Sequence, residues 1–399
     1  MLKVEKIIPG GQALATLPDG KKAFFWNALP GEIIESYDLS KTKSHYIEAI
    51  ATKISNPSKY RVEPKDNCFL STSPWQIIDW QYENQLKTEL VKEIFREHQI
   101  EIISPKIITD NNPYHYRNKM EYSLFWDHET SKNNLAFHAR GSHRKVPITS
   151  SSIERPEILA RALEIVDELN KKHDEARRYQ SLLLRCDQSG KVSGGLYENH
   201  QPHPHFNNLT DILFGKPYSY SPNGFFQINL PVYELALKEI KKHISTDNVL
   251  DLYSGVGTIG LSVARESNLT LVEVDKFAFS ELIKNLSLDD YDNGDTKPLN
   301  QTRIQKDNLL AILSKSEETL DYIKPDQTVI LDPPRAGCDR KLIDRLVETH
   351  PKTIIYLSCN PATQARDIKP LLEKYQIKTI KTFNFFPRTP HIENLVVLC

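Results

Sequence analysis

The second half of the chain alternates short apolar stretches with amphipathic ones. Strands are predicted at Val249–Tyr253, Leu269–Glu273, Thr328–Leu331 and Thr353–Ser358, and helices at Pro231–His243, Ile259–Ala264 and Phe277–Leu286. Strands that alternate with helices predict an α/β fold with a parallel, doubly wound sheet. Because ligands on such sheets bind outside the carboxyl ends of the strands, we expect a site at that edge.

Residues 1–58 predict a small β-barrel. Short strands are expected at Lys3–Ile8, Gln12–Leu17, Lys22–Trp26 and Tyr46–Ile54. Turns such as Pro9-Gly10-Gly11 and Asp19-Gly20 separate them. This pattern resembles the TRAM domain, an OB-like barrel attached to RNA-modifying enzymes, and barrels of this kind bind oligonucleotides on one face. The alternative is a barrel that serves only for packing.

Residues 59–220 are predicted to form a central α+β domain. A helix is expected at Gln81–Gln99, where apolar residues recur at three- and four-residue steps. Strand-like and helix-like stretches are mixed further on, so the topology of this domain is left open. Residues 221–399 contain the strand–helix series and form the third predicted domain.

Composition limits the class of protein. Of the 399 residues, 39% are hydrophobic and 26% are charged, which is typical of a globular protein with a real core. The formal net charge of −1 means that any nucleic-acid surface must come from basic residues gathered on one face. No apolar run approaches the ~20 residues that span a bilayer, and the N-terminus shows no secretory signal. We therefore expect no membrane partner.

The cysteines indicate a reducing compartment. They are Cys68, Cys186, Cys338, Cys359 and Cys399. Because they are scattered and odd in number, a disulfide framework is not expected, and the cytoplasm is the predicted location. No two of them form a CxxC pair, so zinc or iron–sulfur binding has little support.

A glycine-containing loop follows the first strand of the predicted series. Residues Asp251–Gly257 read DLYSGVG, and their glycines let the backbone turn tightly and approach a ligand closely. The loop lacks the third glycine of the dinucleotide fingerprint, so alone it is weak evidence. Glu273 ends the next strand, where an acidic residue can accept hydrogen bonds from ribose hydroxyls. Together these features favour a cofactor that contains ribose.

Two further segments follow strands at the same expected edge. Asp332-Pro333-Pro334 comes directly after a strand, and its prolines stiffen the loop and leave carbonyl groups free. Cys359 follows the strand Thr353–Ser358, and Asn360-Pro361 then turns the chain. An isolated cysteine is most often a buried structural residue. This one is expected beside the cofactor loop, and Cys338 is close enough in sequence to line the same pocket.

A thiol, a carboxylate and a ribose-containing cofactor suggest methyl transfer through a covalent intermediate. Carbon 5 of uracil is a poor nucleophile, and thiolate addition at C6 creates an enolate with electron density on C5. C5 then takes a methyl group from the sulfonium of S-adenosylmethionine. A general base must remove the C5 proton before the thiol can leave. Glu393 is the candidate base, and His391 competes for this role.

These segments resemble the family of uridine-C5 RNA methyltransferases, which make 5-methyluridine in tRNA or 23S rRNA. The motifs that carry the resemblance are Phe225–Asn229 (FFQIN), Asp332–Gly337 (DPPRAG), Leu357–Pro361 (LSCNP) and Phe386–Glu393 (FPRTPHIE). Tyr116–Glu121 and Gly141–Arg144 resemble central segments of the same family. The resemblance covers nearly the whole chain. It implies a Rossmann-like catalytic domain that depends on S-adenosylmethionine.

The resemblance also implies roles for single residues. Cys359 would be the nucleophile and Glu393 the proton acceptor. The residues expected to contact S-adenosylmethionine are Gln227, Tyr253, Thr258, Glu273 and Asp332. The residues expected to contact the target base or the RNA are Phe225, Pro333, Arg335 and His391.

One departure from the family concerns metal. Many members with an N-terminal barrel carry a four-cysteine iron–sulfur site. Here Cys68 stands alone, Ser71–Ser73 occupy the stretch where other ligands would cluster, and Ser150–Ser152 stand where a later ligand would be expected. Because one thiolate cannot hold a cluster, no metal is expected.

RNA is the expected partner, and the barrel-plus-core layout favours 23S rRNA over uridine 54 of tRNA. Basic and aromatic residues at Tyr114–Lys119 and Arg140–Lys145 suit contact with an RNA loop from which a base is extruded, although such stretches are also typical of solvated loops. The chain is expected to act as a monomer.

Three other functions remain open. A cytosine-C5 methyltransferase would share the thiolate chemistry, but it usually places its cysteine after a proline, unlike Ser358-Cys359. An amino-group methyltransferase would end its Asp-Pro-Pro loop in an aromatic residue, where Arg335 stands. A non-catalytic RNA-binding or RNA-folding protein would not need Cys359, Glu393 and Asp332 together.

Overall fold

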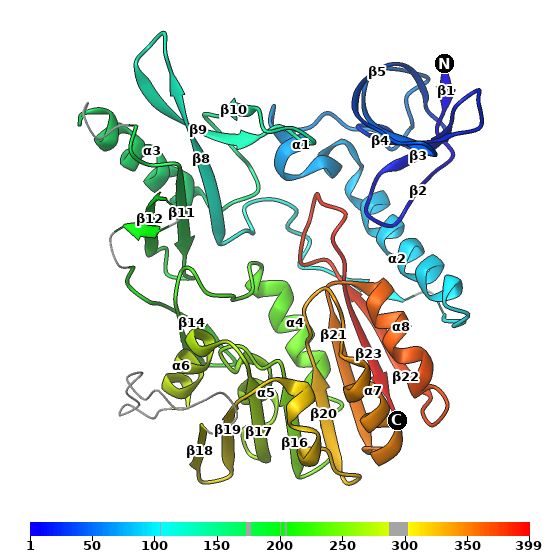
Figure 1. Ribbon diagram of the computed structural model, residues 1–399, viewed down its shortest axis with the longest axis vertical. Coiled ribbons are helices and arrows are strands. Elements are labelled where there is room, and N and C mark those ends of the chain that lie inside the picture. Colours follow the sequence, from blue (N-terminus) through cyan, green and yellow to red (C-terminus); the bar gives the residue numbers. More distant parts are fainter. Residues whose placement is uncertain (104, 173–176, 200, 204–205, 287–301) are drawn as a thin grey trace.

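The computed structural model describes residues 1–399 except 104, 173–176, 200, 204–205 and 287–301. It has three parts: an N-terminal β module, a central sheet with one covering helix, and a large C-terminal sheet flanked by helices. Figure 1 shows the first two parts above the C-terminal sheet, with the loop of residues 384–392, in red, projecting between them. Within the described residues, no helix is both long and apolar enough to cross a membrane.

The N-terminal module is a curled sheet with the strand order β1-β5-β6-β4-β3-β2. Its strands are β1 Leu2–Lys3, β2 Lys6–Ile7, β3 Ala13–Thr16, β4 Lys22–Trp26, β5 Ile33–Thr42 and β6 Tyr46–Ser55. Alternate residues of β3, β4 and β6 are buried, and many of them are alanines, so the sheet can curl tightly around a small core. The pattern of the sequence does not predict β5, because most of its side chains are polar and not buried.

The central part is an antiparallel sheet with the order β10-β9-β8-β11-β12-β13. Its elements are β8 Lys119–Asp127, β9 Lys132–His138, β10 Lys145–Pro147, α3 Pro156–Asn170, β11 Ser181–Cys186, β12 Val192–Glu198 and β13 Gln201–His203. Helix α3 packs on one face, against β9, β11 and β12. A hairpin of β14 Leu209–Leu213 and β15 Lys216–Tyr220 then leads towards the C-terminal part. Two short elements precede the central sheet in the sequence, α1 Phe69–Thr72 and the 3₁₀ turn η1 Pro74–Ile77.

The C-terminal sheet has the order β18-β19-β17-β16-β20-β21-β23-β22-β7 among the described residues. Its strands are β7 Lys106–Ile108, β16 Asn248–Leu252, β17 Asn268–Glu273, β18 Arg303–Lys306, β19 Leu309–Leu313, β20 Gln327–Leu331, β21 Thr353–Ser358, β22 Ile377–Phe383 and β23 Glu393–Leu398. Five neighbouring strands of this sheet run parallel: β19, β17, β16, β20 and β21. The parallel, doubly wound sheet predicted from the sequence is therefore confirmed in the middle of the domain.

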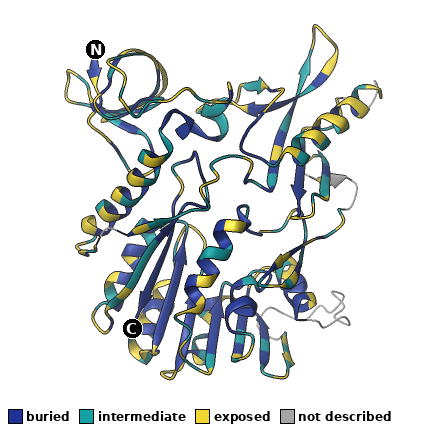
Figure 2. Cartoon of the chain, turned by 180° about the vertical axis from the view of Figure 1, so that it is seen from behind, coloured by how far each residue is buried: buried dark blue, intermediate teal, exposed yellow. Residues whose placement is uncertain are grey.

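Helices cover both faces of this sheet. They are α2 Trp80–Glu97, α4 Leu230–Lys241, α5 Thr258–Val263, α6 Lys276–Asn285, α7 Arg340–Thr349 and α8 Pro361–Leu371, and two 3₁₀ turns lie at η2 Ser316–Glu318 and η3 Leu320–Tyr322. One hydrophobic cluster packs α4, α5 and α6 on one face, and another packs α2, α7 and α8 on the other. The central strands are accordingly buried on both sides, as Figure 2 shows in dark blue.

The C-terminal end of the sheet differs from the predicted pattern. Strand β23 inserts between β21 and β22 and runs antiparallel to both. Helix α2 and strand β7, which lie inside the range expected for the central domain, pack on the C-terminal sheet instead. The hydrophobic pattern marks α2 as amphipathic, but it does not say which sheet receives its apolar face.

A buried ionic cluster joins α2 to the loop that precedes β23. Glu83 and Lys87 are fully buried one turn apart on α2, with 3.2 Å between their charged atoms. The Arg388 guanidinium lies 3.5 Å from the Glu83 carboxylate, and the Arg388 backbone N–H donates to the same carboxylate at 3.0 Å. The Lys87 ammonium also donates to the Asn384 side chain and the Phe386 carbonyl. One carboxylate therefore compensates two cations and anchors the loop.

We predict that Glu83→Gln destabilises the protein strongly. The substitution keeps the shape of the side chain but leaves Lys87 and Arg388 without their anion, a change that costs ~3–5 kcal/mol for buried pairs. Urea unfolding measures this loss. Glu89→Gln, on the exposed side of the same helix, is the matched control and is expected to change stability by less than about 0.5 kcal/mol. Equal values for the two variants would show that the cluster adds no net stability.

Candidate active site

Three predicted site residues meet at the carboxyl edge of the C-terminal sheet. Asp332 follows β20, Cys359 follows the neighbouring β21, and Glu393 is the first residue of β23. The antiparallel register ends with the pair Ser358 and Asn394, so Cys359 directly follows and Glu393 directly precedes the last paired residues of the two strands. Glu393 is only 3% exposed, whereas Cys359 is half-buried and open towards solvent.

Burial raises the pKa values of all three groups. Burial raises the pKa of the Cys359 thiol to about 11, with a further rise from the charges of Glu393 and Asp332, while Arg335 acts in the opposite sense. Burial raises the pKa of Asp332 to about 7. Burial and the neighbouring Asp332 raise the pKa of Glu393 well above its usual range. A cation placed among these groups would therefore stabilise their ionised forms.

Arg335 and His391 form the outer rim of this cluster. Both side chains are exposed, and the Arg335 guanidinium donates to His391 Nδ1 across 3.3 Å. The Arg335 backbone is fixed from α8, because Asn360 Nδ2 donates to its carbonyl at 2.9 Å and Thr363 Oγ1 at 3.2 Å. Partial burial, and then the charge of Arg335, lower the pKa of His391. His391 is thus neutral at neutral pH.

A second acidic group lies beside the glycine loop. Asp251, in β16, is fully buried, and its Oδ2 accepts the Gly260 N–H at 2.8 Å. Its other oxygen, Oδ1, finds no hydrogen-bond partner among the described residues. Burial raises the pKa of Asp251 to about 8, and the Gly260 N–H opposes part of that rise while Asp332 and Glu273 add to it.

The Glu273 carboxylate binds the backbone of the glycine loop. Its Oε2 accepts the Gly255 N–H at 2.7 Å, and its Oε1 accepts the N–H groups of Val274 and Asp275 at 2.8 and 2.6 Å. Burial raises its pKa, against these hydrogen bonds. The carboxylate is therefore held rigidly at the end of β17, with each oxygen already accepting at least one bond.

The helix after the glycine loop is connected to the acidic groups by a tyrosine. Gly257 begins α5 in the left-handed conformation, at a φ of 86°. Thr258 Oγ1 and the Tyr233 hydroxyl lie 2.8 Å apart. Tyr233 is buried, and burial raises its pKa well above the usual range, with Asp332 and Asp251 adding to the rise. Thr258 is thus placed near both acids through Tyr233.

Three further predicted residues are Phe225, Gln227 and Pro333. Phe225 is 72% exposed on the segment before α4. Gln227 is buried, and its backbone carbonyl accepts bonds from Asn118 and Arg185 of the central part. Pro333 is buried beside Asp332. Pro333 adjoins the cluster because it directly follows Asp332 in the sequence.

Tyr253, which is expected to contact S-adenosylmethionine, directly follows β16. Its backbone has a φ of 63°, and its side chain packs into the cluster of α2, α7 and α8, where its pKa is raised by burial and by Cys338. Cys338 is itself buried, and its thiol donates to the Tyr356 hydroxyl at 3.7 Å. Cys338 thus belongs to a buried Tyr–Cys–Tyr contact on that face of the sheet.

Sequence reasoning missed several residues of this region. Asp251 was read only as the start of the loop, and Tyr233 lies on a helix with no motif. Val274 and Phe277 follow Glu273 and are 44% and 80% exposed. Two exposed apolar side chains directly after a strand-ending acid are the signal that could have identified them, because large apolar residues at such a place suit a flat ligand.

The region where iron–sulfur ligands would be expected contains hydrogen-bonded polar groups. Ser152 Oγ donates to Asp66 at 2.7 Å, and Gln76 Nε2 donates to the same carboxylate at 2.7 Å. Burial raises the pKa of the Cys68 thiol to about 12, and Asp66 adds to the rise. Among the described residues, no group of three His, Cys, Asp or Glu side chains is arranged to hold a metal ion.

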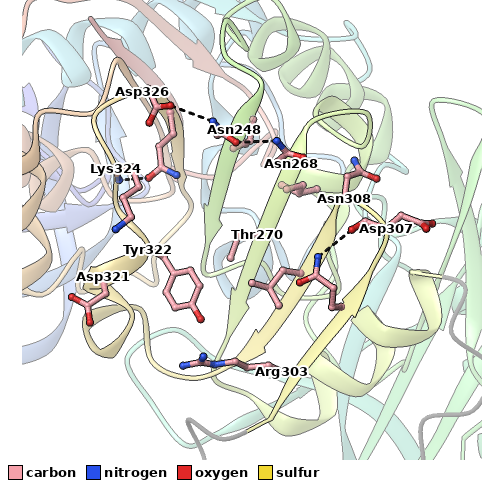
Figure 3. A pocket seen from close by; sticks show the side chains of 15 residues that line it. Asn248, Asn268, Thr270, Arg303, Asp307, Asn308, Asp321, Tyr322, Lys324 and Asp326 are labelled. Atoms are coloured by element: carbon pink, nitrogen blue, oxygen red, sulfur yellow. Dashed lines mark hydrogen bonds between the residues drawn. The ribbon is translucent and has the colours of Figure 1, made fainter.

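A hollow of about 750 Å³ lies at the opposite edge of the sheet (Figure 3). Its lining includes Asn248 and Asn268 at the amino ends of β16 and β17, together with Arg303, Tyr322 and Asp326. At its rim, the Asn248 side chain donates a hydrogen bond to Asp326 and accepts one from the Asn268 side chain. None of the predicted site residues lines it. It is therefore separate from the cluster around Cys359.

Known proteins resemble this chain over its whole length. Residues 215–399 match the family model described as tRNA (Uracil-5-)-methyltransferase. A Lactobacillus johnsonii protein described as an uncharacterized RNA methyltransferase is 29% identical, and the match covers 95% of this chain and 94% of the relative. An Enterococcus faecalis protein with the same description is 28% identical, with 94% and 92% covered.

A solved structure shares the fold. The Pyrococcus abyssi tRNA (uracil-54, C5)-methyltransferase in complex with S-adenosyl-L-homocysteine matches with a TM-score of 0.75 at 22% identity, and the match covers 100% of both chains. The arrangement of all three parts is thus found in a known enzyme fold. The family model thus matches the C-terminal sheet, and relatives described as uncharacterized RNA methyltransferases match 95% and 94% of this chain.

Proposed function

We propose that this protein transfers a methyl group from S-adenosylmethionine to C5 of a uridine in RNA, with Cys359 as nucleophile and Glu393 as proton acceptor. The observation that supports these roles is the pairing of β21 with β23, which ends at Ser358 and Asn394 and leaves the half-buried thiol of Cys359 and the buried carboxyl of Glu393 next to that last pair. The chemistry of an amino-group methyltransferase does not require a nucleophilic thiol beside a carboxyl base, and a protein that only binds RNA requires neither group.

Cys359 would begin the reaction. Its sulfur forms a bond to C6 of uracil, and the electrons of the C5–C6 double bond move towards C4, which leaves C5 nucleophilic. With a pKa of about 11, the thiol needs help to ionise at neutral pH. Arg335, a neighbour that lowers this pKa, is in position to stabilise the thiolate.

S-adenosylmethionine supplies an electrophilic methyl group on a positively charged sulfur. The residues that would hold it fit such a cation, because Asp251 is buried, Asp332 is half-buried, and both have raised pKa values. Among the described residues, the Asp251 Oδ1 has no hydrogen-bond partner. Glu273, at the end of β17, would accept from the ribose. Exposed Val274 and Phe277 offer apolar surface for the adenine.

Glu393 would complete the reaction. After C5 carries both the methyl group and its hydrogen, Glu393 takes the C5 proton, the C5–C6 double bond re-forms, and the bond from C6 to sulfur breaks. A buried carboxyl with a raised pKa is a strong base once it is ionised. His391 suits this role less well, because its side chain is exposed and faces Arg335. His391 and Arg335 would instead contact RNA at the rim, with the exposed Phe225 beside the extruded base.

The choice of RNA is part of the proposal. The sequence layout favours 23S rRNA. Uridine 54 of tRNA is the second candidate, supported by the full-length likeness to the Pyrococcus abyssi tRNA enzyme. Both RNAs should be offered to the purified protein as unmodified transcripts, and the product nucleosides should be separated by mass spectrometry.

We predict that the wild-type protein yields 5-methyluridine and that Cys359→Ala abolishes turnover while S-adenosylmethionine still binds. Cys338→Ala is the matched control, because that thiol is buried against Tyr356 and should not affect turnover. Methylation found only on cytosine or on adenine nitrogen would contradict the proposed reaction. Turnover by Cys359→Ala would contradict the covalent route.

We predict that Glu393→Gln slows turnover by ~10²–10⁴-fold, the usual contribution of a general base, and traps a protein–RNA adduct. The amide cannot take the C5 proton, so the sulfur–C6 bond persists after methylation. The adduct is measured as a slow band on a denaturing gel, with His391→Gln as the parallel variant. Normal turnover without an adduct in Glu393→Gln, and trapping in His391→Gln, would assign the base to His391.

We predict that binding of S-adenosylmethionine releases protons between pH 6 and 7. Asp332 and Asp251, with pKa values of about 7 and 8, are mainly protonated there, and a bound cation favours their ionised forms. Affinity should therefore rise with pH, by up to about tenfold per pH unit for each proton released. Calorimetry in buffers of different ionisation enthalpy measures this release, which should decrease in Asp251→Asn. Buffer-independent heats would contradict the prediction.

A further inference from the structure

The N-terminal module touches the loop of residues 384–392, which leads directly into the proposed base Glu393. This segment is called the base loop below. Gly11 lies in the turn between β2 and β3 and has a φ of +90°. A Cβ atom built on Gly11 would lie 2.2 Å from Pro390 Cβ and 2.7 Å from Pro390 Cγ. The turn and Pro390 are therefore in close contact, with no room for a side chain at position 11. Pro390 lies three residues before Glu393 in the sequence.

Trp75 connects the same two segments a second time. Its indole Nε1–H donates to the Gly11 carbonyl at 3.0 Å, and its backbone N–H donates to the Arg388 carbonyl at 3.0 Å. The Trp75 side chain is 2% exposed. A single buried residue thus holds the turn of the N-terminal module and the base loop at a fixed separation.

The base loop has little freedom to absorb a displacement. On one side of Pro390, Arg388 is bound to Glu83 and to the Ile78 carbonyl. On the other side, Glu393 enters the ladder with β21 and β22. A displacement of Pro390 is therefore confined to the short segment between Arg388 and Glu393, both of which are held in place. Such a displacement is expected to shift Glu393.

We propose that the β2–β3 turn, through Gly11 and Trp75, is a positioning element for Glu393. The N-terminal module then acts on the removal of the C5 proton and not only on affinity for RNA. This inference rests on the proposed function, in which Glu393 takes that proton. Gly11 and Trp75 touch neither substrate nor cofactor and act only through the loop.

The chemistry explains why small shifts matter. A general base must lie within about 2.6–3.2 Å of the group that it deprotonates. A misplacement of about 1 Å can cost ~10²-fold in rate. Addition of Cys359 and transfer of the methyl group do not need Glu393, so a displaced loop should slow elimination and leave the earlier steps intact.

Neighbouring glycines provide a matched pair of variants. Gly10 has a φ of +96°, close to that of Gly11, but a Cβ built on it meets nothing within 4 Å. Both Gly10→Ala and Gly11→Ala carry the same backbone strain, and only Gly11→Ala presses on Pro390. The difference between the two variants therefore isolates the contact.

The experiment measures kcat, KM for RNA, affinity for S-adenosylmethionine and the steady-state fraction of covalent protein–RNA adduct. For Gly11→Ala we expect kcat to fall by ~10–100-fold, the range for a misplaced catalytic group, and the adduct to accumulate, with KM and cofactor affinity unchanged. Gly10→Ala should match the wild type. Adding Pro390→Gly to Gly11→Ala removes the opposing atoms and should restore kcat.

Several results would overturn the inference. These are equal kcat and adduct levels in Gly10→Ala and Gly11→Ala, a change confined to KM, or no recovery in the Pro390→Gly double variant. If Gly11→Ala does not fold, Trp75→Phe replaces it, since this change removes the hydrogen bond to Gly11 and keeps a buried ring; wild-type adduct levels in that variant would refute the inference. A wild-type protein that makes no 5-methyluridine would instead refute the proposed function.

Discussion

The burial of acidic groups against one another at the carboxyl edge of the C-terminal sheet is the constraint on which the site depends. Asp251, Asp332 and Glu393 all have raised pKa values, and the Cys359 thiol shares their region. Because their pKa values are raised, these acids and the thiol ionise less readily, and a bound cation would favour their ionised forms. A methyl donor with a positive sulfur relieves the repulsion, which links cofactor binding to the ionised state that the proposed chemistry needs.

Such crowding requires rigid support, and all three parts of the molecule contribute to it. The loop before Glu393 is fixed by the Glu83–Lys87–Arg388 cluster of α2. Tyr116 of the central part donates to the Pro387 carbonyl at 3.0 Å, and Gly11 of the N-terminal module contacts Pro390. The base loop is therefore the place where the three parts meet, which ties the geometry of the site to the docking of the whole chain.

The sequence predicted much of this architecture because its pattern is local. The parallel strands β16, β17, β20 and β21 follow from apolar runs that end at Asp251, Glu273, Asp332 and Cys359 or next to them. The position of β23 could not be predicted in the same way, because antiparallel insertion is set by long-range pairing and not by periodicity. The need for a base and the resemblance to a family suggested Glu393, and the pairing of Ser358 with Asn394 gives the physical reason for its place near Cys359.

The most direct measurement is the mass of the protein after incubation with S-adenosylmethionine and an RNA in which uridine is replaced by 5-fluorouridine. Fluorine at C5 cannot leave as a proton does, so elimination stops and the covalent complex remains. The account predicts a mass increase of one RNA plus one methyl group, with the modification on the peptide that contains Cys359 after digestion. No adduct, from a protein that methylates C5 of ordinary uridine, or an adduct on another residue, would contradict it.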